Sequence, residues 1–425
     1  MSSNTINRAA AALCLAAALA GIGGLPLDAS AQDLGVKAPA QTQPIAIVNT
    51  RIHPVSGEPF DGFIVFERGT ITQMGPGKAE PAPGTEVIDG RGKHVYPGMI
   101  AAYTQLGLAE IESLRPSTDK NEAGGVTPEA RAVTAVNPDS WLLPVTRANG
   151  VLLAGTFPSG GQVPGRAGVI RLDGWTSEEM TVRQDAGMVV EWPLMRIVRA
   201  AWMDRPEEEQ LRDLRVNLER VRETFRTAAA YSAGKPDRTD LRWEALRAVF
   251  PAPSDKPRPQ LPVFVLANDY DQIIAAVELK RQHKLSMVII GGLEAPRCAQ
   301  LLKDESVPVV ITNVITPPRR DDSPYDENYT LPRRLAAAGV KFCIASGDET
   351  PHERNLPYAA AMAAAHGLDP AAALRSVTFS AAEILGVADR YGSLEGGKSA
   401  TLLITTGNPL EVTTAIDAAF IDGRR

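Results

Sequence analysis

Residues 263–312 indicate the fold class, and they read VFVLANDYDQIIAAVELKRQHKLSMVIIGGLEAPRCAQLLKDESVPVVIT. Three short apolar runs alternate here with two stretches of helical character. The apolar runs are 263–267, 287–290 and 307–312, and the helical stretches are 271–283 and 295–304. Strands that are apolar throughout are typical of a parallel sheet, because such a sheet is buried on both faces. The segment therefore predicts repeated strand–helix units of an α/β fold.

The same alternation extends to both sides, whereas the two ends of the chain differ from it. Further strands are expected at 151–155, 167–172 and 341–345, and helices at 207–231, 331–338, 357–366 and 370–376. Residues 45–96 contain only short β-type runs with turns between them, and β character returns at 400–405 and 418–421. Neither β segment has enough strands to bury a face alone. We therefore expect both ends to build one β domain, with the α/β part inserted between them.

The first 31 residues have the character of a secretory signal peptide. Arg8 provides a positive charge, an apolar stretch follows, and Ala29-Ser30-Ala31 forms an A-x-A cleavage pattern before Gln32. A retained membrane anchor is the alternative, but the stretch is short and interrupted by glycines. We expect a periplasmic or secreted protein with no membrane span after cleavage.

Composition narrows the choice of partners. The chain has 425 residues, 22% of them charged, and a formal net charge of -6 without a basic stripe, which argues against nucleic acid. After cleavage only Cys298 and Cys343 remain, too few for a disulfide framework in a chain of this size. A small-molecule substrate or ligand is the expected partner, and the oligomeric state stays open.

Several motifs resemble the amidohydrolase superfamily, especially its imidazolonepropionase-like members. They are Val95-Tyr96-Pro97-Gly98-Met99-Ile100, the segment 369–382, Leu385-Gly386 and the run from Gly392 to Ala400. The resemblance covers nearly all of 45–425. It implies a (β/α)₈ TIM-like barrel over 97–392, inserted in a small composite β-sandwich domain made of 32–96 and 393–425.

The resemblance also implies a metal site, and this chain departs from the family there. Family members carry H-x-H on the first barrel strand, because residues two apart on a strand face the same side. Tyr103 and Gln105 stand in those places, Ala101 replaces an acidic residue, and Leu266 replaces a later histidine. The five histidines of the chain lie elsewhere, and His352 is the one closest to the expected rim. We therefore expect a degenerate metal site and no zinc or iron cofactor.

Polar residues at the ends of the expected barrel strands are the candidates for a site. By resemblance Asp348 is the catalytic carboxylate, and Tyr103, Gln105, Asn268 and Glu294 are the candidates for a pocket at the C-terminal rim. Two carboxylates brought together without a metal repel each other, so that one pKa rises and supplies a proton donor. The alternative is that these groups only satisfy one another by hydrogen bonds.

Three further signals have both a functional and an ordinary interpretation. Gly392 to Ser399 matches the phosphate-loop pattern, but a β run follows instead of a helix, which indicates a turn. The loop 319–323, with Arg319 and Arg320, either contacts an anionic substrate or is simply solvated. The Gly-rich run 157–162 either lines a pocket, with Ser159 and Gln162, or is only a loop.

Two functions remain open at this point. The resemblance implies a hydrolase acting on non-peptide C–N bonds in cyclic amide-like substrates, with activity altered or lost because the metal-binding histidines are missing. The alternative is a non-catalytic barrel that binds a ligand or another protein in the periplasm. Whether the chain is an enzyme is not decided by fold alone.

Overall fold

The computed structural model describes residues 37–425 apart from 201, 235–237, 253–256, 313, 321 and 348–349. The predicted signal peptide, its cleavage before Gln32 and the candidate Asp348 lie outside the described residues. Within them, no helix combines the length and the apolar character needed to cross a membrane.

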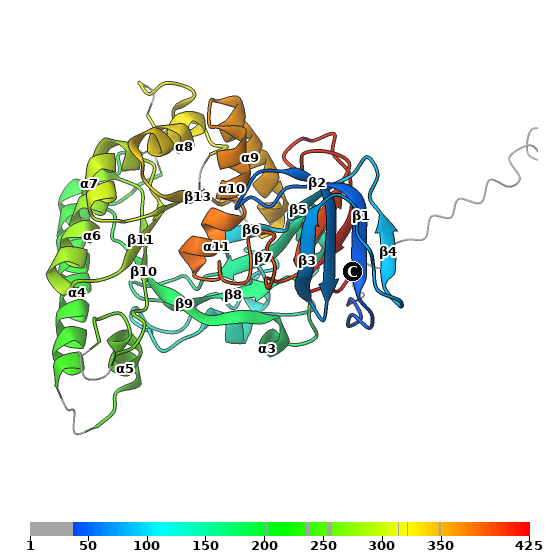
Figure 1. Ribbon diagram of the computed structural model, residues 1–425. Coiled ribbons are helices and arrows are strands. Elements are labelled where there is room, and N and C mark those ends of the chain that lie inside the picture. Colours follow the sequence, from blue (N-terminus) through cyan, green and yellow to red (C-terminus); the bar gives the residue numbers. More distant parts are fainter. Residues whose placement is uncertain are drawn as a thin grey trace, which may run out of the picture. The chain divides into compact units, whose positions relative to one another are not determined.

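One sheet has seven strands drawn from both ends of the chain (Figure 1). Its order is β15-β14-β5-β1-β2-β3, with β4 paired to β1. The strands are β1 (Ile45–Ile52), β2 (Phe60–Glu67), β3 (Thr70–Pro76), β4 (Glu86–Asp89), β5 (His94–Pro97), β14 (Leu402–Thr405) and β15 (Ile416–Phe420). The expected composite arrangement is confirmed, since β14 pairs with β5. The domain boundaries stay a prediction, because residues 37–425 form one compact unit.

The second sheet has eight strands and forms a nearly closed barrel, which confirms the predicted fold class. Its order is β13-β12-β11-β10-β9-β8-β7-β6. The strands are β6 (Met99–Thr104), β7 (Val151–Thr156), β8 (Gly165–Arg171), β9 (Thr181–Glu191), β10 (Val263–Ala267), β11 (Met287–Gly291), β12 (Val309–Ile311) and β13 (Phe342–Ile344). All neighbours are parallel except at β8, which runs antiparallel to β7 and β9.

The barrel departs from a regular (β/α)₈ arrangement in two places. The strands β7, β8 and β9 follow one another as an antiparallel meander, so that no long crossover helix is needed there. The end strands β6 and β13 are not paired with each other in the described sheet. Helix α11 (Phe379–Leu385) packs against both of them, and Ile100 N donates a hydrogen bond to Val377 O at 2.8 Å. This contact region is called the seam below.

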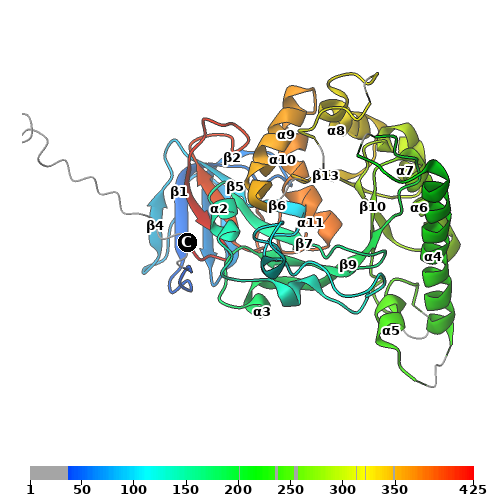
Figure 2. The same ribbon diagram turned by 180° about the vertical axis from the view of Figure 1, so that it is seen from behind.

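Helices cover the outside of the β10–β13 half of the barrel (Figures 1 and 2). Besides α11 they are α4 (Glu207–Ala233), α5 (Leu241–Arg247), α6 (Tyr270–His283), α7 (Ala299–Asp304), α8 (Glu327–Ala338), α9 (Leu356–Ala365) and α10 (Pro370–Ser376). The two short helices α2 (Leu142–Arg147) and α3 (Ser177–Met180) lie on the other side, where α2 contacts β7. Helix α6 begins at a capping box, in which Asp269 and Gln272 satisfy each other's backbone N–H groups. The predicted strand–helix order from 263 to 345 is therefore confirmed.

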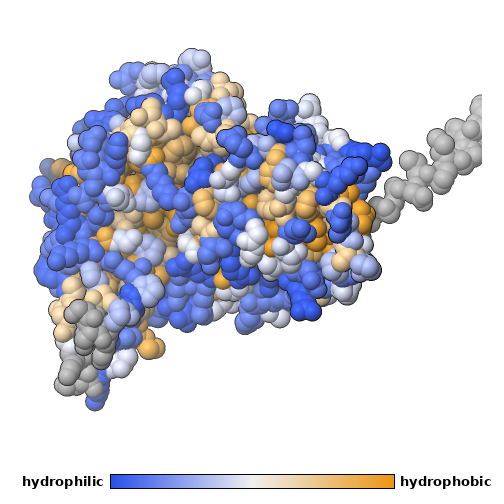
Figure 3. Space-filling model, viewed as in Figure 1, coloured by the Kyte–Doolittle hydropathy of each residue, from blue (hydrophilic) through white to orange (hydrophobic). Residues whose placement is uncertain are grey.

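Hydrophilic side chains cover the outer helices, whereas hydrophobic side chains show over the barrel between those helices and the seven-stranded sheet (Figure 3). The barrel core is apolar, and its largest fully buried side chains include Phe157 and Phe264. Because this interior is filled by side chains, polar chemistry is confined to the strand ends.

A pair of histidines introduces a pH dependence into the seven-stranded sheet. His53 Nε2 lies 2.9 Å from His94 Nδ1, and the His53 ring stacks on Tyr96 at 4.1 Å between centroids. Burial, followed by the charges of His94 and Arg51, lowers the pKa of His53 from 6.5 to about 4. Since the unfolded chain takes up this proton first, the free energy of unfolding falls as the pH drops from 6.5 toward 4. Above pH 6.5 the group has no effect.

We expect His53→Gln to lose part of this acid sensitivity. The fall in melting temperature between pH 6.5 and pH 4 should be smaller in the variant than in the parent, because glutamine binds no proton in that range. His366→Gln serves as the control, since His366 contacts Tyr329 at the other end of the fold. If the melting temperature falls equally in the parent and in His53→Gln between pH 6.5 and pH 4, His53 is not the source of the acid sensitivity.

Candidate functional site

Three aromatic side chains line the inside of the barrel below its C-terminal mouth. The Tyr103 and Phe157 ring centroids are 5.0 Å apart, and Phe157 meets Phe264 edge-on at 5.1 Å. Leu266 shares the face of Phe264, because residues two apart on a strand point the same way. In the parallel ladder Leu266 pairs with Glu191, the last residue of β9. Tyr103, Glu191 and Leu266 therefore belong to the same mouth.

Tyr103 is held as a neutral phenol. Burial, and next the charge of Glu191, raises the pKa of Tyr103 to about 12. A buried phenol with a raised pKa keeps its proton at neutral pH and offers an O–H donor.

Glu191 is a site residue that the sequence analysis missed. Its Oε1 accepts a hydrogen bond from Gly160 N at 2.8 Å, and its own N–H donates to Gln162 O at 3.0 Å. Burial raises the pKa of Glu191, while the Gly160 N–H and the charge of Lys120 act in the opposite direction. The Gly-rich run 157–162 thus lines the site and holds this carboxyl. An acidic residue directly after the apolar triplet 188–190 was the available signal.

The predicted pocket residues Gln105 and Asn268 follow the strands as expected. Gln105 comes directly after β6, is half-buried, and accepts a backbone bond from Leu108 N at 2.9 Å. Asn268 comes directly after β10, and its carbonyl accepts from Glu294 N at 2.9 Å. Its Oδ1 is buried without a hydrogen-bond partner among the described residues. A Cβ on Gly291 would approach this oxygen to 2.3 Å, so glycine is required there.

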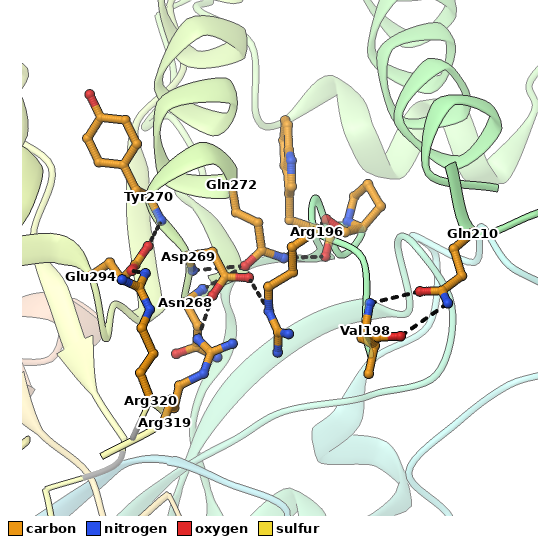
Figure 4. A network of polar contacts seen from close by, with 12 residues as sticks. Arg196, Val198, Gln210, Asn268, Asp269, Tyr270, Gln272, Glu294, Arg319 and Arg320 are labelled. Carbon is orange, nitrogen blue, oxygen red and sulfur yellow. Dashed lines mark hydrogen bonds and ion pairs between the residues drawn. The ribbon is translucent and has the colours of Figure 1, made fainter. Parts of the chain in front are cut away.

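Outside the mouth, two carboxylates hold four arginines in a network at the rim. Figure 4 shows Arg196, Arg319 and Arg320 of this network. Asp269 binds Arg196 through Oδ2 at 3.2 Å and Arg319 through Oδ1. Arg196 comes from the loop after β9 and Arg319 from the loop after β12, so Asp269 joins two loops.

Glu294 organises the second half of this rim. It pairs with Arg297 at 3.0 Å and with Arg320, and its Oε2 accepts from Tyr270 N at 2.7 Å, at the start of α6. The expected partner of Glu294 was the carboxylate of Asp348, which lies outside the described residues. The charged groups that the structure does bring to Glu294 are guanidinium groups, so the expected carboxylate pair stays untested.

The network surrounds a pocket of about 280 Å³. Its lining includes Arg196, Arg297, Arg319, Arg320, Asp269 and Glu294. The Asp269 and Glu294 side chains are 12% and 19% exposed, whereas the guanidinium groups reach further into solvent. The carboxylates therefore hold the arginines in place along the pocket lining. Arg319 and Arg320 are thus part of the rim and not merely solvated.

Four of the five histidines lie away from the expected metal position. His53 and His94 lie at the seven-stranded sheet, His283 packs on Phe225 and Phe250, and His366 packs on Tyr329. In the part of the chain that the structure describes, no three His, Cys, Asp or Glu side chains are grouped for a metal ion. Tyr103, Gln105 and Leu266 remain the residues at the expected ligand positions.

We expect the purified protein to contain well under one equivalent of zinc, iron or manganese, because phenol, amide and alkyl groups are poor ligands for these metals. Elemental analysis after dialysis against metal-free buffer is the measurement. About one or two equivalents per chain that survive dialysis would contradict the prediction.

A nearly closed barrel with polar side chains at the carboxyl ends of its strands is the architecture of amidohydrolase-type proteins. Residues 276–425 match the model of the amidohydrolase family. This part of the chain is thus similar to the amidohydrolase family, in agreement with the resemblance of its motifs.

Individual relatives are distant. The amidohydrolase tasK of Hapsidospora irregularis is 24% identical over 400 residues, which cover 85% of this chain and 39% of that protein. The chain thus spans well under half the length of this curated relative. An amidohydrolase structure from Thermotoga maritima MSB8 superposes with a TM-score of 0.76 at 23% identity, covering 90% of this chain and all of that one. Molinate hydrolase superposes with a TM-score of 0.53 at 14% identity, over 90% of this chain and 94% of that one. These structures show the fold.

Proposed function

We propose that this protein hydrolyses a non-peptide C–N bond of a small polar compound, such as a cyclic amide, at the C-terminal mouth of the barrel. The observation that carries the proposal is Glu191, a half-buried carboxyl with a raised pKa that lies across the ladder from Leu266. Such a group is suited to acid–base work near neutral pH. The predicted signal peptide leads us to propose that the reaction takes place in the periplasm or outside the cell.

The chemistry assigned to the mouth needs two groups. The carboxylate of Glu191 takes a proton from water as the water oxygen attacks the carbonyl carbon. The neutral O–H of Tyr103 donates to the oxygen that becomes negative. The carboxyl of Glu191 then returns its proton to the nitrogen as the C–N bond breaks.

The rim network supports a substrate that carries a carboxylate. Arg196 and Arg319 reach the same pocket, each held by a different oxygen of Asp269. Guanidinium groups oriented in this way are suited to bidentate binding of a planar anion. We propose that the rim holds this end of the substrate while the C–N bond lies in the mouth.

The second candidate is a non-catalytic binding barrel, and one observation favours it. The family's metal ligands are replaced by Tyr103, Gln105 and Leu266, which removes the usual means of lowering the pKa of water. In this case the same mouth and rim bind a ligand without cleaving it.

Glu191→Gln separates the two candidates. The parent is screened against cyclic imides, lactams and N-acyl amino acids for hydrolysis and for a ligand-induced rise in melting temperature. With a cleaved compound, we expect the variant to bind but to react about 10²–10⁴-fold more slowly. Glu208→Gln, on the exposed first turn of α4, is the matched control. Cleavage at the parental rate would rule out the role of Glu191, and ligand binding without cleavage by the parent would favour the binding barrel.

A further inference from the structure

We infer a second binding site, for a phosphate or sulfate group, in a pocket of about 380 Å³. The pocket lies between residues of the seven-stranded sheet and Arg171 at the end of β8. It shares no lining residue with the rim pocket, and it does not depend on the proposed function. Its lining residues are Ala40, Gln41, Arg68, Gly69, Thr70, Arg171, Arg390, Gly397, Ser399, Asp422 and Arg424.

Four arginines reach this pocket from four separate segments. Arg68 lies in the turn between β2 and β3, Arg171 ends β8, Arg390 follows α11, and Arg424 lies near the chain end. The only carboxylate among the lining residues is Asp422. Glu179 and Glu67, which lie outside the lining, pair with Arg424 and Arg68, so the excess positive charge of the pocket resides on Arg390.

Asp422 is already saturated by its neighbours and does not neutralise the remaining arginines. Its side chain is 13% exposed and binds Arg171. It also accepts hydrogen bonds from Tyr391 Oη at 3.0 Å and from Ser399 Oγ. This carboxylate therefore acts as a fixed part of the pocket floor.

The arginines differ in how tightly they are held. Arg171 and Arg424 have side chains that are 21% and 26% exposed, and Arg424 pairs with Glu179 at 2.7 Å. Arg68 is 90% exposed and lies 3.8 Å from Glu67. Arg390 is exposed and stacks on the Tyr391 ring at 5.1 Å, without an ion pair to a described residue. Arg171 and Arg424 are thus held in place before an anion binds, whereas Arg68 and Arg390 are available to an incoming anion.

The backbone of the Gly392–Ser399 turn does not supply the anion site, although its sequence matches a phosphate loop. Gly397 N donates to Ile71 O at 2.8 Å, and Lys398 Nζ is taken up by Ser393 and Glu395 at 2.6 and 3.0 Å. Strand β14 follows, so the interpretation as a turn is confirmed. The anion contacts must come from guanidinium groups, whose forked N–H groups match the oxygens of a phosphate or sulfate group.

The site is tested by isothermal titration calorimetry of the full chain at constant ionic strength. The probes are inorganic phosphate, inorganic sulfate and glycerol 3-phosphate, each compared with chloride. We expect saturable binding of at least one probe to the parent. Arg390→Ala should weaken it about tenfold, which is the usual effect of losing a hydrogen bond to a charged group. Arg390→Lys should weaken anion binding less, because lysine keeps the positive charge and lacks only the bidentate N–H geometry of a guanidinium group.

Arg215→Ala is the matched control, since Arg215 is an exposed arginine on α4, far from the lining residues. Arg390 makes no ion pair with a described residue, so its variants should keep the parental melting temperature in the absence of anion. Equal binding of all three probes identifies a general oxyanion site, and preference for glycerol 3-phosphate identifies a phosphate ester as the ligand. Absence of binding to the parent, or binding that Arg390→Ala and Arg68→Ala both leave unchanged, would overturn the inference.

Discussion

A chain that ends before Leu394 should form aggregates instead of a soluble folded protein. Strand β14 lies between β5 and β15 in the seven-stranded sheet, so the deletion removes two strands and uncovers β5. Leu402 and Phe420 are fully buried there against residues of the N-terminal strands such as Ile47 and Ile64. Loss of this layer leaves an apolar sheet face and an unpaired edge in water.

The measurement is the soluble fraction after expression, followed by thermal melting of any soluble protein. A graded version is Phe420→Ala, which should reduce the free energy of unfolding by about 3–5 kcal/mol because Phe420 packs edge-on against Phe66 at 5.2 Å. Val412→Ala is the control, as this side chain is 79% exposed and should change stability by less than about 0.5 kcal/mol. Parental solubility and melting of the truncated chain would contradict the prediction.

Asp422→Ala should also destabilise the protein strongly, by about 3–5 kcal/mol, because it leaves the partly buried Arg171 without its carboxylate. The hydroxyl groups of Tyr391 and Ser399 lose an acceptor at the same time. The readout is the denaturant midpoint in urea, with an unchanged slope.

Asp61→Ala is the comparison variant for this measurement. Asp61 also pairs with an arginine, Arg51 at 3.2 Å, but its side chain is 79% exposed. An exposed pair of this kind contributes about 1 kcal/mol or less. If the urea midpoint of Asp422→Ala is no lower than that of Asp61→Ala, the Arg171–Asp422 pair is not important for stability.

The order of the elements from 263 to 345 was predictable because the strands there are apolar and the helices α6 and α8 carry boundary signals. Asp269 and Gln272 form a capping box, and Gly339 ends α8 in the left-handed region with φ 73°. Strand β9 was not predictable in the same way. Its first half, residues 181–185, is polar and it contains Gly187, so its stability comes from β8 and β10 on either side.

The candidate site was predictable only in part, for a related reason. Motif spacing placed Tyr103, Gln105 and Leu266 at the strand ends where the structure has them. Glu191 was missed together with the strand that carries it. The rim network was missed because Arg196, Asp269 and Arg319 lie far apart in sequence and meet only after β9, β10 and β12 are assembled. The predicted role of Asp348 stays a prediction.

The seam between β6 and β13 has a consequence for how the barrel opens. In a barrel closed by a continuous ladder, strand amides exchange with solvent deuterium only after paired strands separate. Here α11, a helix of seven residues, takes the place of that ladder. An outward movement of this one helix exposes the edges of β6 and β13 while every strand pair stays intact. Deuterium uptake in these two strands therefore reports local opening at the seam, at a lower free energy than global unfolding.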